Sequence, residues 1–322
     1  FKAFFIKIFF VYHSVYFSNF HFFSNYSYQE YLPVYHNNMI LININNTSCK
    51  ISGSLDRSIE LQIDKVTSYL HQGHRYIAQK RGFSGGWNGI VKLYKNKSFP
   101  VGLLEEVKKV FDRNSLQYSL IDNRPIIQYG ESLSISKDSF FKPRDYQINA
   151  RDTAVKHSSG IIKVATGGGK TGIISMIAGH YNSKTVIYVI GIELLYQMKE
   201  TIENLYPKLE VGMIGDGVCD IKKINVATIW SAAAAFNKKI SILDNDCTKE
   251  KTNSSLDKEK VRKMVHEAEL FILDECQYAA ANTVQFLHKE STSARHRFLF
   301  SASPWRDSGD DILINAVGGS KI

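Results

Sequence analysis

The sequence predicts an α/β fold in which helices cover both faces of a parallel sheet, preceded by a small α/β or α+β domain. Short apolar runs alternate with helical segments along the second half of the chain, as in a parallel sheet that is buried on both faces. One run leads into a glycine-rich turn, and another ends in an Asp-Glu pair. Polar groups at the carboxyl ends of such strands are typical of a ligand site.

The start of the chain differs in composition from the rest. Phe, Tyr, Asn and Ser dominate residues 1–38, and no acidic residue precedes Glu30. The apolar stretch Ala3–Phe10 is far shorter than the roughly 20 residues that span a bilayer, so we expect no membrane partner. We interpret residues 1–38 as a non-native or disordered extension, read through from upstream of an AT-rich gene, with Met39 as the natural start.

A small nucleic-acid-binding domain is expected over residues 39–130. It opens with a strand-like alternation after Met39, and amphipathic helices are predicted near Ile59–Leu70 and Val101–Phe111. Asn88-Gly89 is a tight-turn dipeptide, and the alternation over Ile90–Tyr94 predicts a half-buried strand. A connector, Ile126–Phe140, leads out of this domain.

The larger domain is expected over residues 131–322. Its predicted strands are Ile161–Val164, Val186–Ile190, Ile224–Thr228, Phe271–Leu273 and Arg297–Phe300. Asn237–Lys260 is charged and has no apolar periodicity, so we expect a surface loop that runs into a helix at Val261–Ala268.

The glycine-rich turn predicts a phosphate site. Four residues between an apolar strand and a helix would offer backbone N–H groups to phosphates: Thr166, Gly167, Gly168 and Gly169. Lys170 would then contact the β- and γ-phosphates of ATP, and the Thr171 hydroxyl would bind Mg²⁺. The match to the phosphate-loop pattern is partial because Val164 stands where that pattern begins with Gly.

The Asp-Glu pair supplies the second half of the predicted site. Asp274 would hold Mg²⁺, and Glu275 would polarise the attacking water. A lone Gly-Gly-Gly-Lys is more often an ordinary turn, and a lone Asp-Glu is often only a solvated strand end. Their joint occurrence at the ends of two apolar strands favours ATP hydrolysis.

Composition agrees with a polyanionic partner. The chain has 40 Lys and Arg against 31 Asp and Glu, a formal net charge of +9, which favours nucleic acid. The four cysteines, Cys49, Cys219, Cys247 and Cys276, have no paired spacing. They suggest neither a zinc site nor disulfides, so we expect an intracellular, reducing location.

Two flanking segments complete a resemblance to a known family. Phe141-Lys-Pro-Arg-Asp-Tyr-Gln147 precedes the phosphate loop, and Phe300-Ser-Ala-Ser-Pro-Trp-Arg306 follows the acidic box. In this order the motifs resemble those of superfamily 2 helicases, which implies a RecA-like ATP-binding domain. By that resemblance Gln147 would read the adenine, supported by Arg144 and Tyr146, and Gln277 would be part of the catalytic box.

The same resemblance implies coupling and DNA-contacting residues. Ser301, Ala302 and Ser303 would couple the phosphate site to nucleic acid, with Ser303 replacing the usual Thr and retaining its hydroxyl. Backbone contacts are implied for Gly191, Thr228 and Trp230. Gly215, in Gly215-Asp-Gly217, would lie in a loop that grips the backbone, although a plain turn is an equal alternative.

The N-terminal third resembles the small domain of UvsW-type phage helicases, which remodel duplex or branched DNA. The resemblance rests on Gly82-Phe-Ser-Gly-Gly-Trp-Asn-Gly-Ile-Val-Lys-Leu-Tyr94 and Phe99-Pro-Val-Gly-Leu-Leu104. Trp87 in the first segment is a candidate DNA contact, and a core aromatic is the alternative.

A second motor domain, which in the family supplies an arginine finger, has no counterpart in this sequence. We therefore expect a fragment whose full activity needs that domain. Two alternatives stay open, the motor subunit of a restriction-type enzyme and a duplex-DNA-binding module that does not hydrolyse ATP.

Overall fold

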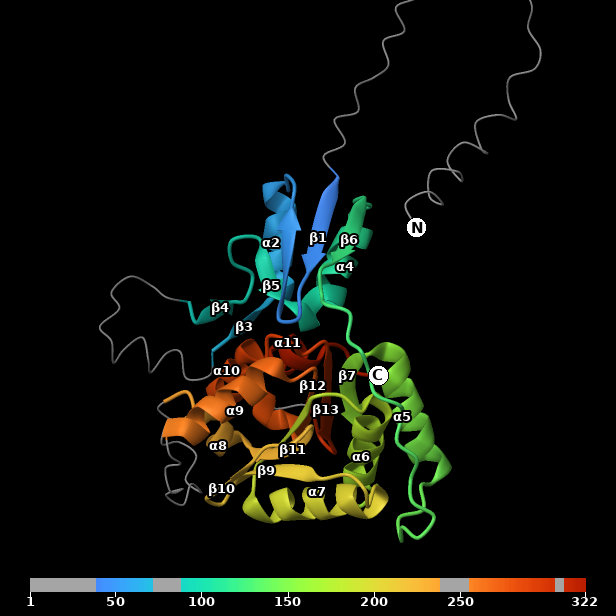
Figure 1. Ribbon diagram of the computed structural model, residues 1–322. Helices are drawn as coiled ribbons and strands as arrows, with labels where there is room; N and C mark the ends of the chain where they lie inside the picture. The colour runs from blue at the N-terminus through green and yellow to red at the C-terminus, as the bar shows by residue number, and fades with distance from the viewer. Residues whose placement is uncertain (1–38, 72–87, 238–254, 305–309) are drawn as a thin grey trace, which may run out of the picture. The chain divides into compact units, whose positions relative to one another are not determined.

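The computed structural model describes residues 39–71, 88–237, 255–304 and 310–322 (Figure 1). The interpretation of residues 1–38 and the candidate Trp87 lie outside these ranges, as does most of the predicted surface loop. All described residues belong to one compact unit, which contains a four-stranded, a seven-stranded and a two-stranded sheet.

The four-stranded sheet has the order β5-β2-β1-β6. Its strands are β1 (Ile40–Ile44), β2 (Ser48–Ser52), β5 (Ser98–Pro100) and β6 (Tyr118–Asp122). Of its pairs, only β1 with β6 is parallel. The long connection that a parallel pair requires includes helices α2 (Arg57–Val66) and α4 (Leu104–Arg113). The alternate residues of β1 enter a core with Ile63 and Phe111, which confirms the strand predicted after Met39.

One predicted helix of this region ends earlier than expected. The helix predicted to reach Leu70 ends at Val66, and Ser68–Leu70 form β3, which pairs with β4 (Ile90–Lys92). The Thr67 hydroxyl donates to the Ile63 carbonyl at 2.7 Å. The helix ends at the β-branched pair Val66-Thr67, where the chain enters the β3–β4 pairing. The spacing of apolar residues contains no information about this strand pairing. The second predicted helix is present as the short turn η1 (Val101–Leu103) followed by α4.

The seven-stranded sheet has the order β10-β9-β11-β8-β12-β13-β7. The five predicted strands are confirmed as β7 (Ser159–Lys163), β8 (Thr185–Val189), β11 (Ile224–Thr228), β12 (Leu270–Asp274) and β13 (His296–Ser301). Two further strands, β9 (Val211–Gly215) and β10 (Val218–Asp220), were not predicted. They form a hairpin whose turn residues, Asp216 and Gly217, both have positive φ, as a type I′ turn requires.

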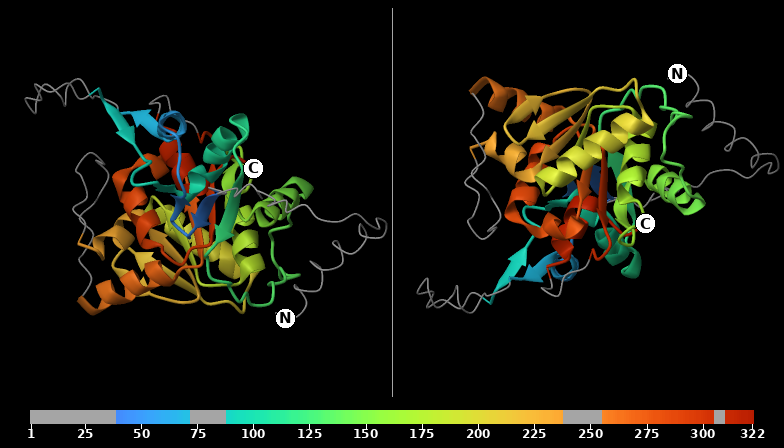
Figure 2. Two further views of the ribbon diagram at one scale, coloured as in Figure 1. Left: turned by 90° about the horizontal axis from the view of Figure 1, so that it is seen from above. Right: turned by 90° about the horizontal axis from the view of Figure 1, so that it is seen from below.

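Helices cover both faces of this sheet (Figures 1 and 2), which confirms the predicted fold class. On one face lie α5 (Asp145–His157), α6 (Lys170–Tyr181) and α7 (Ile192–Leu205). On the other lie α8 (Ile229–Ala234), α9 (Ser255–Glu267), α10 (Asn282–Glu290) and α11 (Ile312–Gly318). Helix α9 begins six residues before the predicted Val261, inside the stretch expected to be loop. None of the helices in the described ranges is long and apolar enough to cross a membrane.

Residues from both sheets meet around the start of β13. Ala316 of α11 belongs to the core of the four-stranded sheet, whereas Ile314 and Val317 belong to that of the larger sheet.

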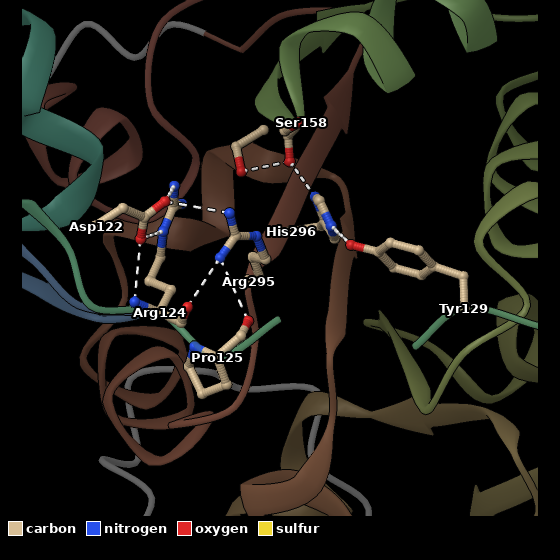
Figure 3. Close-up of polar contacts among 8 residues, drawn as sticks. Asp122, Arg124, Pro125, Tyr129, Ser158, Arg295 and His296 are labelled. Carbon is tan, nitrogen blue, oxygen red and sulfur yellow. Dashed lines mark hydrogen bonds and ion pairs between the residues drawn. The ribbon is translucent and has the colours of Figure 1, made fainter. Parts of the chain in front are cut away.

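Arg295 pairs with Asp122 at 3.1 Å (Figure 3). His296 Nδ1 lies 2.8 Å from the Ser158 carbonyl, and its Nε2 lies 2.5 Å from the Tyr129 hydroxyl (Figure 3). Because a carbonyl only accepts, Nδ1 carries the proton and Nε2 accepts from Tyr129.

Candidate nucleotide and nucleic-acid site

The predicted ATP residues lie at the carboxyl ends of three adjacent strands. The glycine-rich loop follows β7, Asp274 ends β12 and is followed by Glu275, and Ser301 ends β13. These strands are neighbours in the order β12-β13-β7. The sheet therefore brings together segments that are more than 100 residues apart in sequence.

The loop depends on glycine at two positions. Gly167 and Gly169 both have a φ of +75°, a conformation that L side chains adopt only at a cost. Gly169 is the residue that precedes α6, so the first N–H groups of that helix face the loop. A side chain at Gly168 would come within 2.7 Å of Val164. The loop thus has the open backbone of an anion site at a helix N-terminus.

Gln147 and Tyr146 support this loop from α5. The Gln147 amide nitrogen donates to the Gly168 carbonyl at 3.1 Å, and the Tyr146 hydroxyl donates to the same oxygen at 2.9 Å. The Gln147 carbonyl accepts from the Arg144 backbone N–H at 2.9 Å. Gln147 is only 4% exposed, whereas the Arg144 side chain is exposed. The predicted adenine contact stays a prediction, and the structure adds a loop-holding role for Gln147.

Lys170 lies against the acidic pair. Its ammonium contacts Glu275 and lies 3.5 Å from the Asp274 carboxylate. Burial alone would lower the pKa of Lys170, but the hydrogen bond to Glu275 and the two negative charges outweigh it and raise that pKa. Burial would likewise raise the pKa of Glu275, yet Lys170 and Gln277 lower it. Asp274 is almost fully buried, and this burial raises its pKa.

A chain of hydrogen bonds links Glu275 to the third motif. Gln277 donates to Glu275 at 3.0 Å, Ser301 donates to the Gln277 carbonyl at 2.8 Å, and the Ser303 N–H donates to the Ser301 hydroxyl at 3.1 Å. Ala302 lies between the two serines. Glu275 itself has a φ of +58°, which is strained for a residue with a side chain. The acidic box and the coupling motif therefore form one connected unit.

The donor set next to the loop fits a hard cation. Asp274 offers a buried carboxylate beside the start of α6, which carries the Thr171 hydroxyl, and Mg²⁺ prefers such oxygen ligands.

A cavity of about 610 Å³ adjoins the loop, lined in part by Tyr146, Thr153 and Thr166. Its volume falls in the range of small-molecule sites.

The predicted DNA-contacting residues lie on the other half of the same sheet edge. Gly191 follows β8, Gly215 ends β9 and Thr228 ends β11, and these strands are adjacent in the order β9-β11-β8. A side chain at Gly215 would meet Thr228 at 3.0 Å. Trp230 is half-buried in α8 and packs on the core. Thr228 is 1% exposed, and its hydroxyl accepts from the Ser231 N–H at 3.1 Å, so it caps α8.

Sequence reasoning missed one polar pair beside these residues. The Tyr196 hydroxyl, on α7, donates to the Asp216 carboxylate at 2.9 Å. The pair ties α7 to the hairpin turn after Gly215. The Asp-Gly dipeptide was the available signal for this turn, but the partner helix could not be inferred without the strand order.

Comparison with known proteins identifies the family. A family model described as the type III restriction enzyme, res subunit, matches residues 140–306, which is more than half of the chain. The chain belongs to this family. Its matched segment covers the predicted Gln motif, the loop, the acidic box and the third motif, and the predicted relation to superfamily 2 helicases is thereby confirmed.

Two curated relatives resemble this res-subunit family member. The DNA 3'-5' translocase XPB2 of Sulfurisphaera tokodaii is 31% identical over 148 residues, 45% of this chain and 31% of that protein. The putative helicase 22 of Sulfolobus islandicus filamentous virus is 27% identical over 188 residues, 56% of this chain and 31% of that protein. The chain thus spans about a third of the length of either relative.

The fold of this family member matches a solved helicase structure. The crystal structure of the UvsW helicase from bacteriophage T4 matches with a TM-score of 0.66 and 17% identity, over 88% of this chain and 99% of that one. A second structure of T4 UvsW gives a TM-score of 0.65, with 88% of this chain and 56% of that one covered. These matches confirm the predicted fold.

Proposed function

We propose that this chain is the ATP-binding part of an ATP-dependent DNA helicase or translocase that remodels duplex or branched DNA inside the cell. The contact between Lys170 and Glu275 carries the proposal, because it places the phosphate-binding cation and the water-activating carboxylate side by side. The family match and the names of the two relatives, a DNA translocase and a putative helicase, support it.

The ion pair suggests how nucleotide binding prepares the site. The β- and γ-phosphates of ATP would compete with Glu275 for the Lys170 ammonium, because they carry more negative charge. Once Lys170 turns to the phosphates, Glu275 would be free to accept a hydrogen bond from the attacking water. Gln277 and Ser301 would keep the carboxylate in place during this exchange.

The remaining ATP contacts are proposed for the loop, the adjoining cavity and the two oxygen ligands. The backbone of Thr166–Gly169 would cradle the phosphates, and the cavity beside Tyr146 would take the nucleoside. Gln147 would read the adenine, with Arg144 and Tyr146 in support. Thr171 and Asp274 would hold Mg²⁺, which would neutralise charge on the phosphate oxygens.

DNA is the proposed partner of the neighbouring half of the sheet edge. Gly191, Gly215, Thr228 and Trp230 would contact the phosphodiester backbone, with Trp87 as a further candidate. Thr228 would act through its backbone, because its hydroxyl caps α8. Ser301, Ala302 and Ser303 would couple the two halves, because β13 ends beside the acidic box. Binding to duplex DNA should weaken steeply as salt rises, since neutralised phosphates release counterions.

The test is binding of ATP to the wild-type chain, Lys170→Ala and Glu275→Gln, with DNA-stimulated phosphate release by the same proteins extended through a second motor domain as the second readout. We expect Lys170→Ala to lose ATP binding and Glu275→Gln to retain it while phosphate release falls. Equal ATP affinity in all three proteins, with unchanged circular dichroism, would remove the assignment of the site.

The restriction-type motor subunit is a second candidate, favoured by the description of the matched family. Both functions use the same ATP site, so the discriminating readout is the fate of DNA. Separation or movement of strands without cleavage supports the helicase, and ATP-dependent cleavage supports the restriction subunit. A module that binds duplex DNA without hydrolysing ATP would give neither, and phosphate release would be absent.

A further inference from the structure

Arg297, at the start of β13, is a buried cation that has no charged partner among the residues that the structure describes. It is 2% exposed, and its guanidinium donates to the carbonyl oxygens of Asn46, at 3.1 Å, and Ser291, at 2.8 Å. Its Nη1 atom has no hydrogen-bond partner among the described residues. Burial lowers the pKa of Arg297 to about 9, which leaves the group charged at neutral pH. An uncompensated buried charge is strongly unfavourable.

This side chain lines a cavity of about 320 Å³ between the two sheets. Arg124 and Arg295 line the same cavity, and Ser159 and Ser320 add hydroxyl groups. Arg297 is four residues before Ser301 in β13, so the cavity is roughly 13 Å from the carboxyl edge at about 3.3 Å per residue. It lies at the amino end of the strands, and Ile322 lines both this cavity and the cavity beside the glycine-rich loop.

The charges around this cavity do not balance. Arg124 and Arg295 share one carboxylate, Asp122, at 2.7 and 3.1 Å (Figure 3). The hydrogen bond from Arg124 holds the pKa of Asp122 well below its usual range, so this carboxylate is ionised and cancels one positive charge. Glu105, also at the cavity, is paired with Lys108 at 2.9 Å. Among the described residues at the cavity, three guanidinium groups are balanced only by Asp122, because Glu105 is already paired with a lysine, so two positive charges are left in excess.

We propose that this cavity, at the junction of the two sheets, binds a phosphate group between Arg297, Arg295 and Arg124. A phosphate monoester or inorganic phosphate carries about −1.5 to −2 charges near pH 7, which matches the excess. Its oxygens accept several hydrogen bonds, and Nη1 of Arg297 would donate one of them. The site would be distinct from the loop at Lys170. The bound phosphate would bridge Arg124, which follows β6, and Arg297 in β13.

The experiment measures phosphate binding with the loop disabled. Lys170→Ala serves as the parent, so that phosphate bound at the nucleotide site does not contribute. Thermal unfolding and titration calorimetry are run in inorganic phosphate against chloride at equal ionic strength. The variants are Arg297→Met and Arg295→Gln, each combined with Lys170→Ala. Arg151→Gln is the matched control, because it removes an arginine that pairs with Asp152 on α5.

We expect phosphate to raise the unfolding midpoint of the parent and of the Arg151→Gln control. Arg295→Gln and Arg297→Met should each weaken phosphate binding roughly tenfold or more, the usual effect of losing a charge-assisted hydrogen bond. Single-stranded oligonucleotides with a 5′-phosphate or a 5′-hydroxyl provide the second probe. A preference for the 5′-phosphate that Arg295→Gln abolishes would assign the group to a nucleic-acid end, and a response to inorganic phosphate alone would assign a free ion.

The proposal fails if the parent responds to neither probe, or if Arg295→Gln binds phosphate as tightly as the parent does. Arg297→Met leaves two carbonyl groups without their donor and can prevent folding. In that case Arg295→Gln decides alone, because Arg295 lines the cavity and its side chain is partly exposed.

Discussion

Replacing Gly169 by Ala should separate two functions of the glycine-rich loop. Gly169 and Gly167 have the same φ of +75°, so an alanine suffers the same backbone strain at either position. The surroundings differ, because a methyl group at Gly169 would overlap the Gln147 amide nitrogen, whereas a methyl group at Gly167 would meet nothing within 4 Å. Gly167→Ala is therefore the matched control.

The structure sets the size of the difference. Backbone strain should cost each variant about 1–2 kcal/mol of unfolding free energy. Gly169→Ala must also displace the Gln147 amide, which then loses its bonds to Gly168 and Arg144. Leaving such a buried polar group unsatisfied costs about 1–3 kcal/mol more. We therefore expect Gly169→Ala to be destabilised by that further amount relative to Gly167→Ala.

Urea unfolding of both variants, alone and combined with Gln147→Ala, measures this difference. In the Gln147→Ala background the overlap no longer exists, so the two alanine variants should be equally stable. Equal stability of the two alanine variants when Gln147 is present would refute the reasoning, because it would mean that Gln147 does not restrain the loop. A difference that persists after Gln147→Ala would assign the cost to another neighbour.

Three further predictions concern the site and the junction. Lys170→Ala should lose ATP binding with its circular dichroism unchanged; calorimetry with ATP checks this, and retained affinity would contradict it. Glu275→Gln should bind ATP normally but hydrolyse it about 10²–10⁴ times more slowly in DNA-stimulated assays, because only water activation is lost. Burial lowers the pKa of His296 from 6.5 to about 4, so the unfolded chain binds its proton first as pH falls. Stability should fall between pH 6.5 and 4, by up to about 3 kcal/mol from this group. Urea unfolding at pH 7.5 and at pH 5 measures this fall in unfolding free energy, which should be smaller in His296→Asn than in the wild-type chain. An equal fall in both proteins would assign the pH dependence to other groups, such as His288, whose pKa is also lowered by burial.

The sequence by itself determined the fold class and the chemical groups of the ATP site. The apolar runs that end before Thr166, at Asp274 and at Ser301 are buried on both faces of the sheet, which is why they stand out as continuous runs. The loop and the acidic box are local patterns, because a strand end followed by a turn requires particular residue types at fixed spacing. Local patterns of this kind are readable without the tertiary fold.

The same reasoning failed where local and tertiary signals compete. No strand is predicted at Val211–Gly215, where only Gly215 is assigned, to a loop; the pairing of this segment with β10 and β11 makes it a strand. The predicted helix over Ile59–Leu70 lost its last turn to the pairing of β3 with β4. In both places the outcome depends on a partner strand, and periodicity within one segment carries no information about that partner.

Only the tertiary structure decided which groups meet. The strand order places the ATP residues and the predicted DNA residues on adjacent halves of one edge. The packing of α5 on the loop sets Gln147 against Gly168. The junction of the two sheets buries Arg297 away from the carboxylates of the described part of the chain. In sequence Arg297 is one more basic residue at the start of a predicted strand. Its environment comes from Asn46, about 250 residues away along the chain, and such a contact is a property of the packed fold alone.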